Sequence, residues 1–178
     1  MTVREARNRY DAMLARFQGK DILDFNVDDS QLLWAITFTA SRLDSIGQVE
    51  DLILGTLCGA QTFSSNDPSL PTYPDAYGVE EQLRWDVVSS EDRPFLLSEF
   101  LTQRIGTCAT YTLVAAIVLR STRDCGPLTI CITNRTNLVR PNHVWLKMED
   151  GRVIDLLSRS QGKASLPGLR PDREISLK

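Results

Sequence analysis

The sequence predicts an α+β fold in one domain of 178 residues, with helices in the first half and antiparallel strands in the second. Residues 2–18 carry apolar side chains at a spacing of three to four, which is typical of an amphipathic helix. Residues 107–119 predict a helix with a small, apolar face. β-Branched or alternating segments separated by turn residues then predict strands at 128–133, 143–148 and 152–157.

The other elements follow from caps, turns and periodicity. Asp28 or Asp29 is expected to cap a second helix that runs to about Leu43. Further helices are expected at 49–57, 79–88 and 94–103.

Two segments are expected to lack regular structure. Residues 59–78 are rich in Pro, Ser, Asn and Asp, which predicts a long loop that is either a solvated connector or a lid over a site. Residues 159–178 are expected to form an extended tail on the surface.

Composition excludes several classes of protein. A net charge of −3 without a basic run argues against nucleic acid as a partner. No apolar stretch approaches the ~20 residues that span a bilayer, and the N-terminus has no apolar signal core, so we expect a cytoplasmic protein without a membrane partner, with leaderless export as an alternative.

The cysteines suggest neither a disulfide framework nor a metal site. The chain has four cysteines without a CxxC pair and only one histidine, so a zinc site would need widely separated ligands. We expect reduced thiols, no metal and no cofactor.

The only histidine, His143, lies in a hairpin whose register can be derived. If residues 149–151 form a three-residue loop with Gly151 in the left-handed region, Leu146 opposes Ile154 and the apolar face stays intact. His143 and Asp155 are then diagonal neighbours, roughly 7–8 Å apart at the backbone. A carboxylate placed there can orient the imidazole and stabilise its charged form.

Cys108 is the candidate nucleophile. Gly106 ends the preceding helix and Thr107 is a suitable N-cap, which places Cys108 in the first turn of the next helix. A helix N-terminus favours the thiolate, and its N–H groups can bind an oxyanion. Each of these residues alone is more often structural, and Cys58, beside Gly59, is a rival nucleophile. Cys125 and Cys131 are expected to be core residues.

Two stretches resemble the transglutaminase-like (papain-like Cys-His-Asp) superfamily. Arg104-Ile-Gly-Thr-Cys108-Ala-Thr-Tyr111 is similar to its nucleophile helix, and Asn142-His143-Val-Trp145 followed by Gly151 and Asp155 is similar to its His and Asp strands. The resemblance covers residues 94–158. It implies a catalytic triad of Cys108, His143 and Asp155 on a helix packed against an antiparallel sheet. Where that family often has Pro after the Asp, this chain has Leu156-Leu157.

The resemblance implies a thioester on Cys108 formed from a protein or peptide amide. Water as acceptor gives a peptidase, amidase or deamidase, whereas an amine acceptor gives crosslinking. Residues 94–158 would be the catalytic core, and the mainly helical residues 1–93 would recognise the substrate. Trp145, Tyr111 and Asn142 are candidate substrate-binding residues, although Trp145 and Tyr111 suit the core equally well.

Two alternatives remain open. The first is acyl transfer as in arylamine N-acetyltransferases, which have Arg-Gly-Gly-x-Cys where this chain has Arg104-Ile-Gly-Thr-Cys108. The second is a non-catalytic binding module on the same fold.

Overall fold

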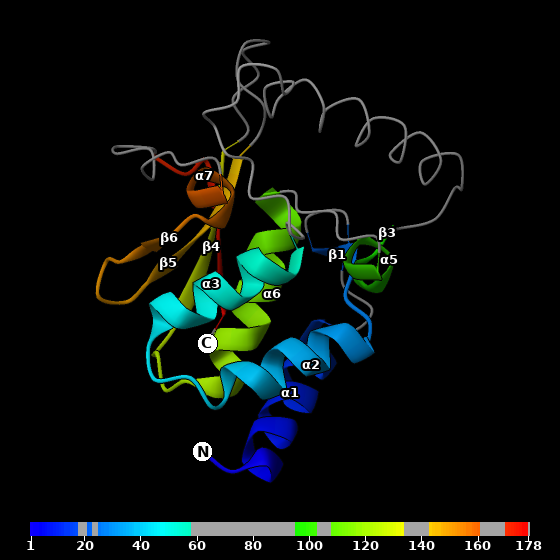
Figure 1. Cartoon of the computed structure of the whole chain (residues 1–178). Coiled ribbons are helices and arrows are strands. Elements are labelled where there is room, and N and C mark those ends of the chain that lie inside the picture. Colours follow the sequence, from blue (N-terminus) through cyan, green and yellow to red (C-terminus); the bar gives the residue numbers. More distant parts are fainter. Residues whose placement is uncertain are drawn as a thin grey trace, which may run out of the picture.

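The structure is a computed structural model that describes residues 1–17, 21–22, 25–57, 95–102, 108–133, 143–160 and 170–177. These residues form an α+β fold, as the sequence predicts (Figure 1). The described helices are α1 (Val3–Phe17), α2 (Gln31–Ala40), α3 (Ile46–Leu57), α5 (Leu97–Thr102), α6 (Cys108–Thr122) and α7 (Leu156–Ser160). The described strands are β1 (Asp21–Ile22), β2 (Phe25–Asn26), β3 (Phe95–Leu96), β4 (Leu128–Thr133), β5 (His143–Met148), β6 (Val153–Ile154) and β7 (Arg173–Leu177).

Helix α6 runs through the centre of the hydrophobic core. All of residues 110–122 except Arg120 are buried. Helices α1, α2 and α3 contact α6, as do strands β4 and β5, so α6 lies between helices and sheet (Figure 1). A helix that is mostly apolar on every side is stable only when neighbouring elements cover it all round.

The main sheet is antiparallel, in the order β6-β5-β4-β7. β4 and β5 have the predicted bounds and pair along their full length, from Leu128 opposite Met148 to Thr133 opposite His143. A second, smaller sheet joins β1, β2 and β3, with β2 and β3 parallel.

The predicted hairpin register is confirmed. Leu146 pairs with Ile154 and Lys147 with Val153. The backbone N–H of Gly151 donates to the carbonyl of Met148 (3.0 Å), and Gly151 has a φ of +85°. The loop therefore takes the conformation that glycine alone adopts at little cost.

The strand predicted over 152–157 is wrong beyond residue 154. Pairing ends at Ile154, and Leu156–Ser160 forms helix α7. The backbone N–H of Ser158 donates to Oδ1 of Asp155 (3.1 Å), which is N-cap geometry. Capping turns the chain out of the sheet, so the expected pairing of Val144 with Leu156 does not form.

The cap predicted for the second helix is also wrong. Ser30 caps α2 and accepts from the N–H of Leu33. Asp29 instead accepts from the hydroxyl of Tyr10 (2.8 Å), and Asp28 accepts from the N–H of Ser98 (2.9 Å). Both carboxylates therefore bond to distant segments, and α2 ends at Ala40, three residues before the predicted end.

Other predictions differ in their bounds. The helix expected at 2–18 is α1, but α3 begins three residues before the predicted start and α6 extends three residues past the predicted end. Among the described residues of the helix expected at 94–103, residues 95–96 are strand β3 and residues 97–102 are helical.

The C-terminal tail holds a strand that the sequence analysis missed. Residues 173–177 form β7, which pairs with β4 at the edge of the sheet, with Leu177 opposite Leu128. The first residues of the tail belong to α7, which Arg159 links to α3 through ion pairs with Glu50 and Asp51.

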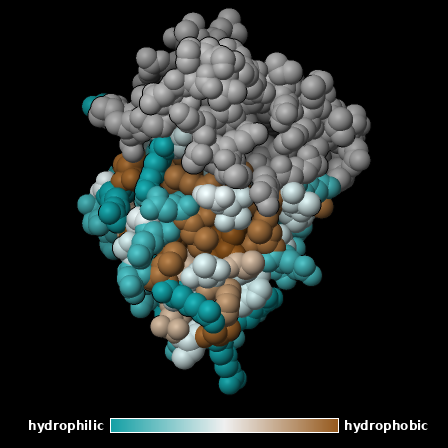
Figure 2. All heavy atoms as spheres, in the orientation of Figure 1, coloured by the Kyte–Doolittle hydropathy of each residue, from teal (hydrophilic) through white to brown (hydrophobic). Residues whose placement is uncertain are grey.

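Several predictions lie outside the described residues. They are the loop at 59–78, the helix at 79–88, the cap at Thr107 after Gly106, and the placement of Cys58 and Asn142. Among the residues that the structure describes, no helix is both long enough and apolar enough to cross a bilayer. Figure 2 shows apolar atoms gathered over α3, where Leu52 and Leu54 are partly buried against the core.

Replacing Gly151 with alanine should lower the free energy of unfolding by about 1–2 kcal/mol, because the left-handed conformation strains any residue with a Cβ. Nothing lies within 4 Å of the added Cβ, so the loss of stability reflects backbone strain and not a steric clash. Gly55, inside α3 and equally open, is the matched control, and Gly55→Ala should stabilise by about 0.5–1 kcal/mol. Urea unfolding measures both, and equal changes of the same sign would contradict this account of the loop.

Candidate catalytic site

The three residues of the predicted triad lie on elements that meet at one end of the molecule. Cys108 is the first residue of α6, His143 is the first of β5, and Asp155 immediately precedes α7. Figure 1 shows the start of α6, the start of β5 and α7 at the same end of the fold. Both β5 and α7 contact α6.

Two threonines fix the start of β5. The hydroxyl of Thr112, one turn into α6, donates to the backbone carbonyl of Val144 (3.2 Å). On the next strand, Oγ1 of Thr133 accepts from the backbone N–H of His143 (3.2 Å). The first bond ties Val144, the residue after His143, to the helix that carries Cys108. The second bond ties His143 itself to β4.

His143 and Asp155 are in direct contact. Nε2 of His143 lies 2.7 Å from Oδ2 of Asp155, and the two side chains are 14% and 3% exposed. The ring of His143 also stacks on Trp145, with centroids 5.7 Å apart and planes 23° apart. The carboxylate and the indole together fix the orientation of the imidazole.

The thiol of Cys108 is hydrogen-bonded to His143. Because Asp155 binds Nε2, the nitrogen that remains for Cys108 is Nδ1. Cys108 is partly exposed, and the first N–H groups of α6 have no acceptor within the helix. The arrangement places a thiol, a base and an orienting carboxylate in sequence at the N-terminus of a helix.

The surroundings of His143 favour its charged form. Burial lowers its pKa, but the hydrogen bonds to Asp155 and Cys108 outweigh burial and raise the pKa to about 9. At neutral pH the ring is therefore an imidazolium, held between a carboxylate and a sulfur atom.

Ser158 is a member of this cluster that the sequence analysis missed. Its hydroxyl donates to Oδ2 of Asp155 (2.7 Å), the same oxygen that faces His143. Burial raises the pKa of Asp155, but the bonds from His143 and Ser158 more than offset this and lower it. The Asp-x-x-Ser spacing is a helix-cap pattern, which could have revealed Ser158 if residues 155–157 had not been interpreted as strand.

The structure brings only some of the other predicted site residues close to the triad. Trp145 is 5% exposed and contacts His143 through its ring face. Tyr111 is 2% exposed within the hydrophobic core. Cys131 is buried, as predicted, whereas Cys125 is only partly buried. Substrate contacts by Trp145 and Tyr111 stay predictions.

Within the described ranges, no three His, Cys, Asp or Glu side chains are grouped so that they could hold a metal ion. Comparison of the chain with protein-family models, curated proteins and solved structures finds no match. Any function therefore has to be argued from the geometry of this site.

The histidine titration can be measured without signal assignment, because His143 is the only histidine in the chain. In tag-free protein, the imidazole NMR signal should titrate with a pKa of about 9. Cys108→Ala should lower that pKa, since the bond to sulfur is lost while burial remains. Cys125→Ala, which removes a thiol that bonds to Leu119 and Gly126 instead, should leave it unchanged. A wild-type value at or below 6.5, the ordinary value for histidine, would refute the geometry.

Ser158→Ala should cost about 1.5–3 kcal/mol of unfolding free energy at neutral pH, because it removes a buried hydrogen bond to a carboxylate. The fold lowers the pKa of Asp155 below its ordinary value of 3.8. The stabilisation from the Ser158 bond is therefore present above pH 3.8 and is lost as the pH falls through the lowered pKa of the folded protein. Urea unfolding across this range should therefore show the cost shrinking in acid.

Ser160→Ala is the matched control for that measurement. The hydroxyl of Ser160 is on the same helix but donates to a neutral acceptor, the carbonyl of Leu157 (2.7 Å). Its removal should cost about 1 kcal/mol or less at every pH. If both variants show the same pH dependence, the bond from Ser158 does not act through the charge of Asp155.

Proposed function

We propose that this protein is a transglutaminase-like thiol hydrolase that cleaves a protein or peptide amide through a thioester on Cys108. The observation that supports this most strongly is the hydrogen-bonded series from Cys108 through His143 to Asp155. Structural cysteines and histidines have no need of a shared hydrogen bond, whereas a thiol nucleophile needs an adjacent base with an orienting third group.

In the first half of the proposed reaction, the thiolate of Cys108 attacks the carbonyl carbon and forms a C–S bond. The carbonyl electron pair moves to oxygen, and the N–H groups at the start of α6 stabilise that oxyanion. The imidazolium of His143 donates its proton to the nitrogen, the C–N bond breaks and the amine leaves. The high pKa of His143 suits it to the role of acid in this step.

The second half regenerates the enzyme. Neutral His143 accepts a proton from water, the resulting oxygen nucleophile attacks the thioester, and the C–S bond breaks to release a carboxylic acid. Asp155 keeps the ring oriented and stabilises its charge throughout. An amine in place of water gives crosslinking by the same steps, and hydrolysis is our first choice because it needs no second substrate site.

Alkylation tests the nucleophile without a known substrate. Iodoacetamide at mildly acidic pH should label Cys108 before the other cysteines, as read by peptide mass spectrometry. His143→Gln should slow this labelling by about tenfold or more, because the thiolate loses its cationic partner. Cys125→Ala, which leaves the triad intact, is the control. Fast labelling at Cys58, or the same rate in His143→Gln, would overturn the assignment.

The fate of the thioester separates the alternatives. Incubation with a peptide library should release acids or ammonia, and Asp155→Asn should reduce turnover by about two to four orders of magnitude. Acetylation of Cys108 by acetyl-coenzyme A would instead support acyl transfer of the arylamine N-acetyltransferase type. A protein whose measurable effects all survive Cys108→Ala is a binding module.

A further inference from the structure

We propose that a pocket between α1 and the C-terminal end of α6 binds a small phosphoryl anion, of the class of phosphate or diphosphate. The pocket has a volume of about 260 Å³. It is lined by Arg9, Ala12, Met13, Arg16, Arg120, Arg123 and Asp124. This inference does not depend on the proposed catalytic function.

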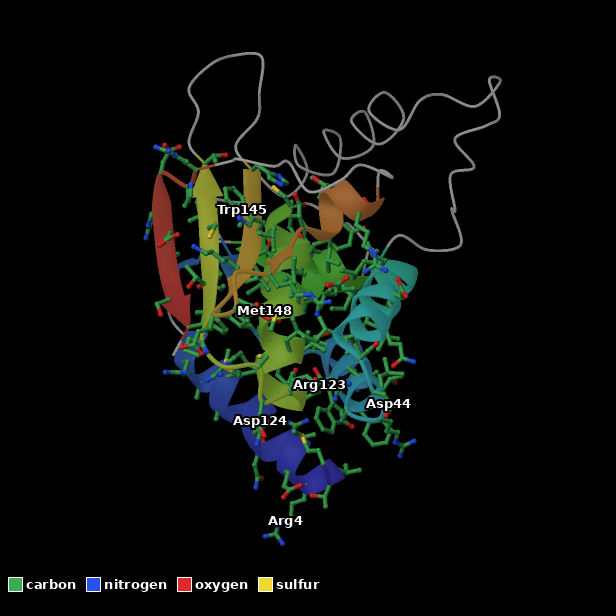
Figure 3. All side chains as sticks on the ribbon, turned by 90° about the vertical axis from the view of Figure 1, so that its left-hand side faces the viewer. Arg4, Asp44, Arg123, Asp124, Trp145 and Met148 are labelled. Atoms are coloured by element: carbon green, nitrogen blue, oxygen red, sulfur yellow. The ribbon has the colours of Figure 1, made fainter. Side chains whose placement is uncertain are left out.

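Four arginines around one carboxylate make this hollow strongly positive in a chain whose net charge is −3. Arg9 and Arg16 lie two turns apart on the same face of α1. Arg120 lies in the last turn of α6, and Arg123 directly follows the end of that helix. Asp124 forms an ion pair with Arg9 (2.8 Å), with the two side chains 40% and 89% exposed. In Figure 3, Arg123 lies at the end of α6 and Asp124 lies beside α1.

Arg120 and Arg123 are held in place by backbone carbonyls. Nη1 of Arg120 donates to the carbonyl of Gly126 (2.8 Å), and Arg123 donates to the carbonyls of Thr122, Ala40 and Leu43. Carbonyl acceptors orient a guanidinium without neutralising its charge. In the described part of the chain, the Nε–H groups of both arginines are buried without a hydrogen-bond partner, so any contact with an anion has to use their Nη groups. Positive charge that is fixed in place favours binding of an anion.

Charge and volume indicate the class of ligand. A phosphoryl group carries two or more negative charges and several acceptor oxygens, so it can accept from the guanidinium donors of more than one arginine. The pocket is slightly smaller than the ~300–1,000 Å³ of drug-sized sites, so it suits a phosphate or diphosphate with little attached. Nucleic acid is disfavoured, because it needs an extended basic stripe rather than one hollow.

The pocket is separate from the candidate catalytic site. Cys108 and Thr122 are the two ends of α6, about 20 Å apart at 1.5 Å per residue. Anion binding can therefore be measured directly, without any enzymatic readout.

Isothermal titration calorimetry with sodium diphosphate at constant ionic strength tests this proposal, with inorganic phosphate as a second probe. The wild type should bind one equivalent of diphosphate more tightly than phosphate, and added NaCl should weaken both. Arg9→Gln and Arg16→Gln should each weaken diphosphate binding by about tenfold or more, since each loses a charge-assisted bond. Diphosphate should also raise the melting temperature of the wild type.

Arg4→Gln is the matched control, because it removes the same charge from the same helix outside the pocket (Figure 3). The affinity of this variant for diphosphate should stay within about twofold of the wild type if the losses in the other two variants come from the pocket rather than from the change in net charge. Equal losses in all three variants, or no heat with either anion and no change in melting temperature, would overturn the proposal. So would tighter binding of a mixed-sequence RNA oligonucleotide that the same substitutions abolish, which would assign the arginines to a nucleic-acid backbone.

Discussion

The enclosure of α6 is the constraint on which the rest of this structure depends. Its side chains are uncharged over almost the whole helix and mostly apolar, so an exposed face would forfeit the free energy gained by burial, about 25 cal/mol for each Å² of apolar surface. Helices cover one side and the sheet covers the other. The residues that remain partly exposed are therefore near its ends: Cys108 and Ala109 at the start and Arg120 in the last turn. Both proposed sites lie where this buried helix reaches the surface.

Asp155 decides the geometry at the N-terminal end of α6. Its carboxylate accepts from His143 and from both the N–H and the hydroxyl of Ser158. A carboxylate on a side chain that is only 3% exposed needs such partners, because burial without hydrogen bonds costs several kcal/mol. One residue thus ends strand β6, caps α7 and holds the imidazole. In the proposed reaction, proton transfer would depend on this fixed ring.

The hairpin could be predicted from the sequence because residues close together along the chain define it. Alternation along 143–148 and Gly151 at the turn define which residues pair, and the pairing of Leu146 with Ile154 agrees with them. The predicted cap at Asp28 or Asp29 failed for the opposite reason, because these carboxylates bond to Ser98 and Tyr10, residues far away in the sequence. The strand predicted over 155–157 failed because Asp155 caps α7 through Ser158, a local contact that outweighs the strand pattern. Strand β7 was missed because its short, polar sequence is extended only through pairing with β4.

The sequence by itself determined the α+β class, the positions of the long helices, the bounds of β4 and β5, and the alignment of the single histidine with Asp155. Periodicity, glycine at a turn and the hydrophobic pattern depend on neighbours along the chain, so they can be interpreted without coordinates. Only the tertiary structure decided that Ser158 donates to Asp155, that Trp145 stacks on His143, and that arginines from α1 and α6 line one pocket. Those contacts depend on how packed elements are oriented in three dimensions, because hydrogen bonds and charge clusters form between whichever side chains burial of the core brings together.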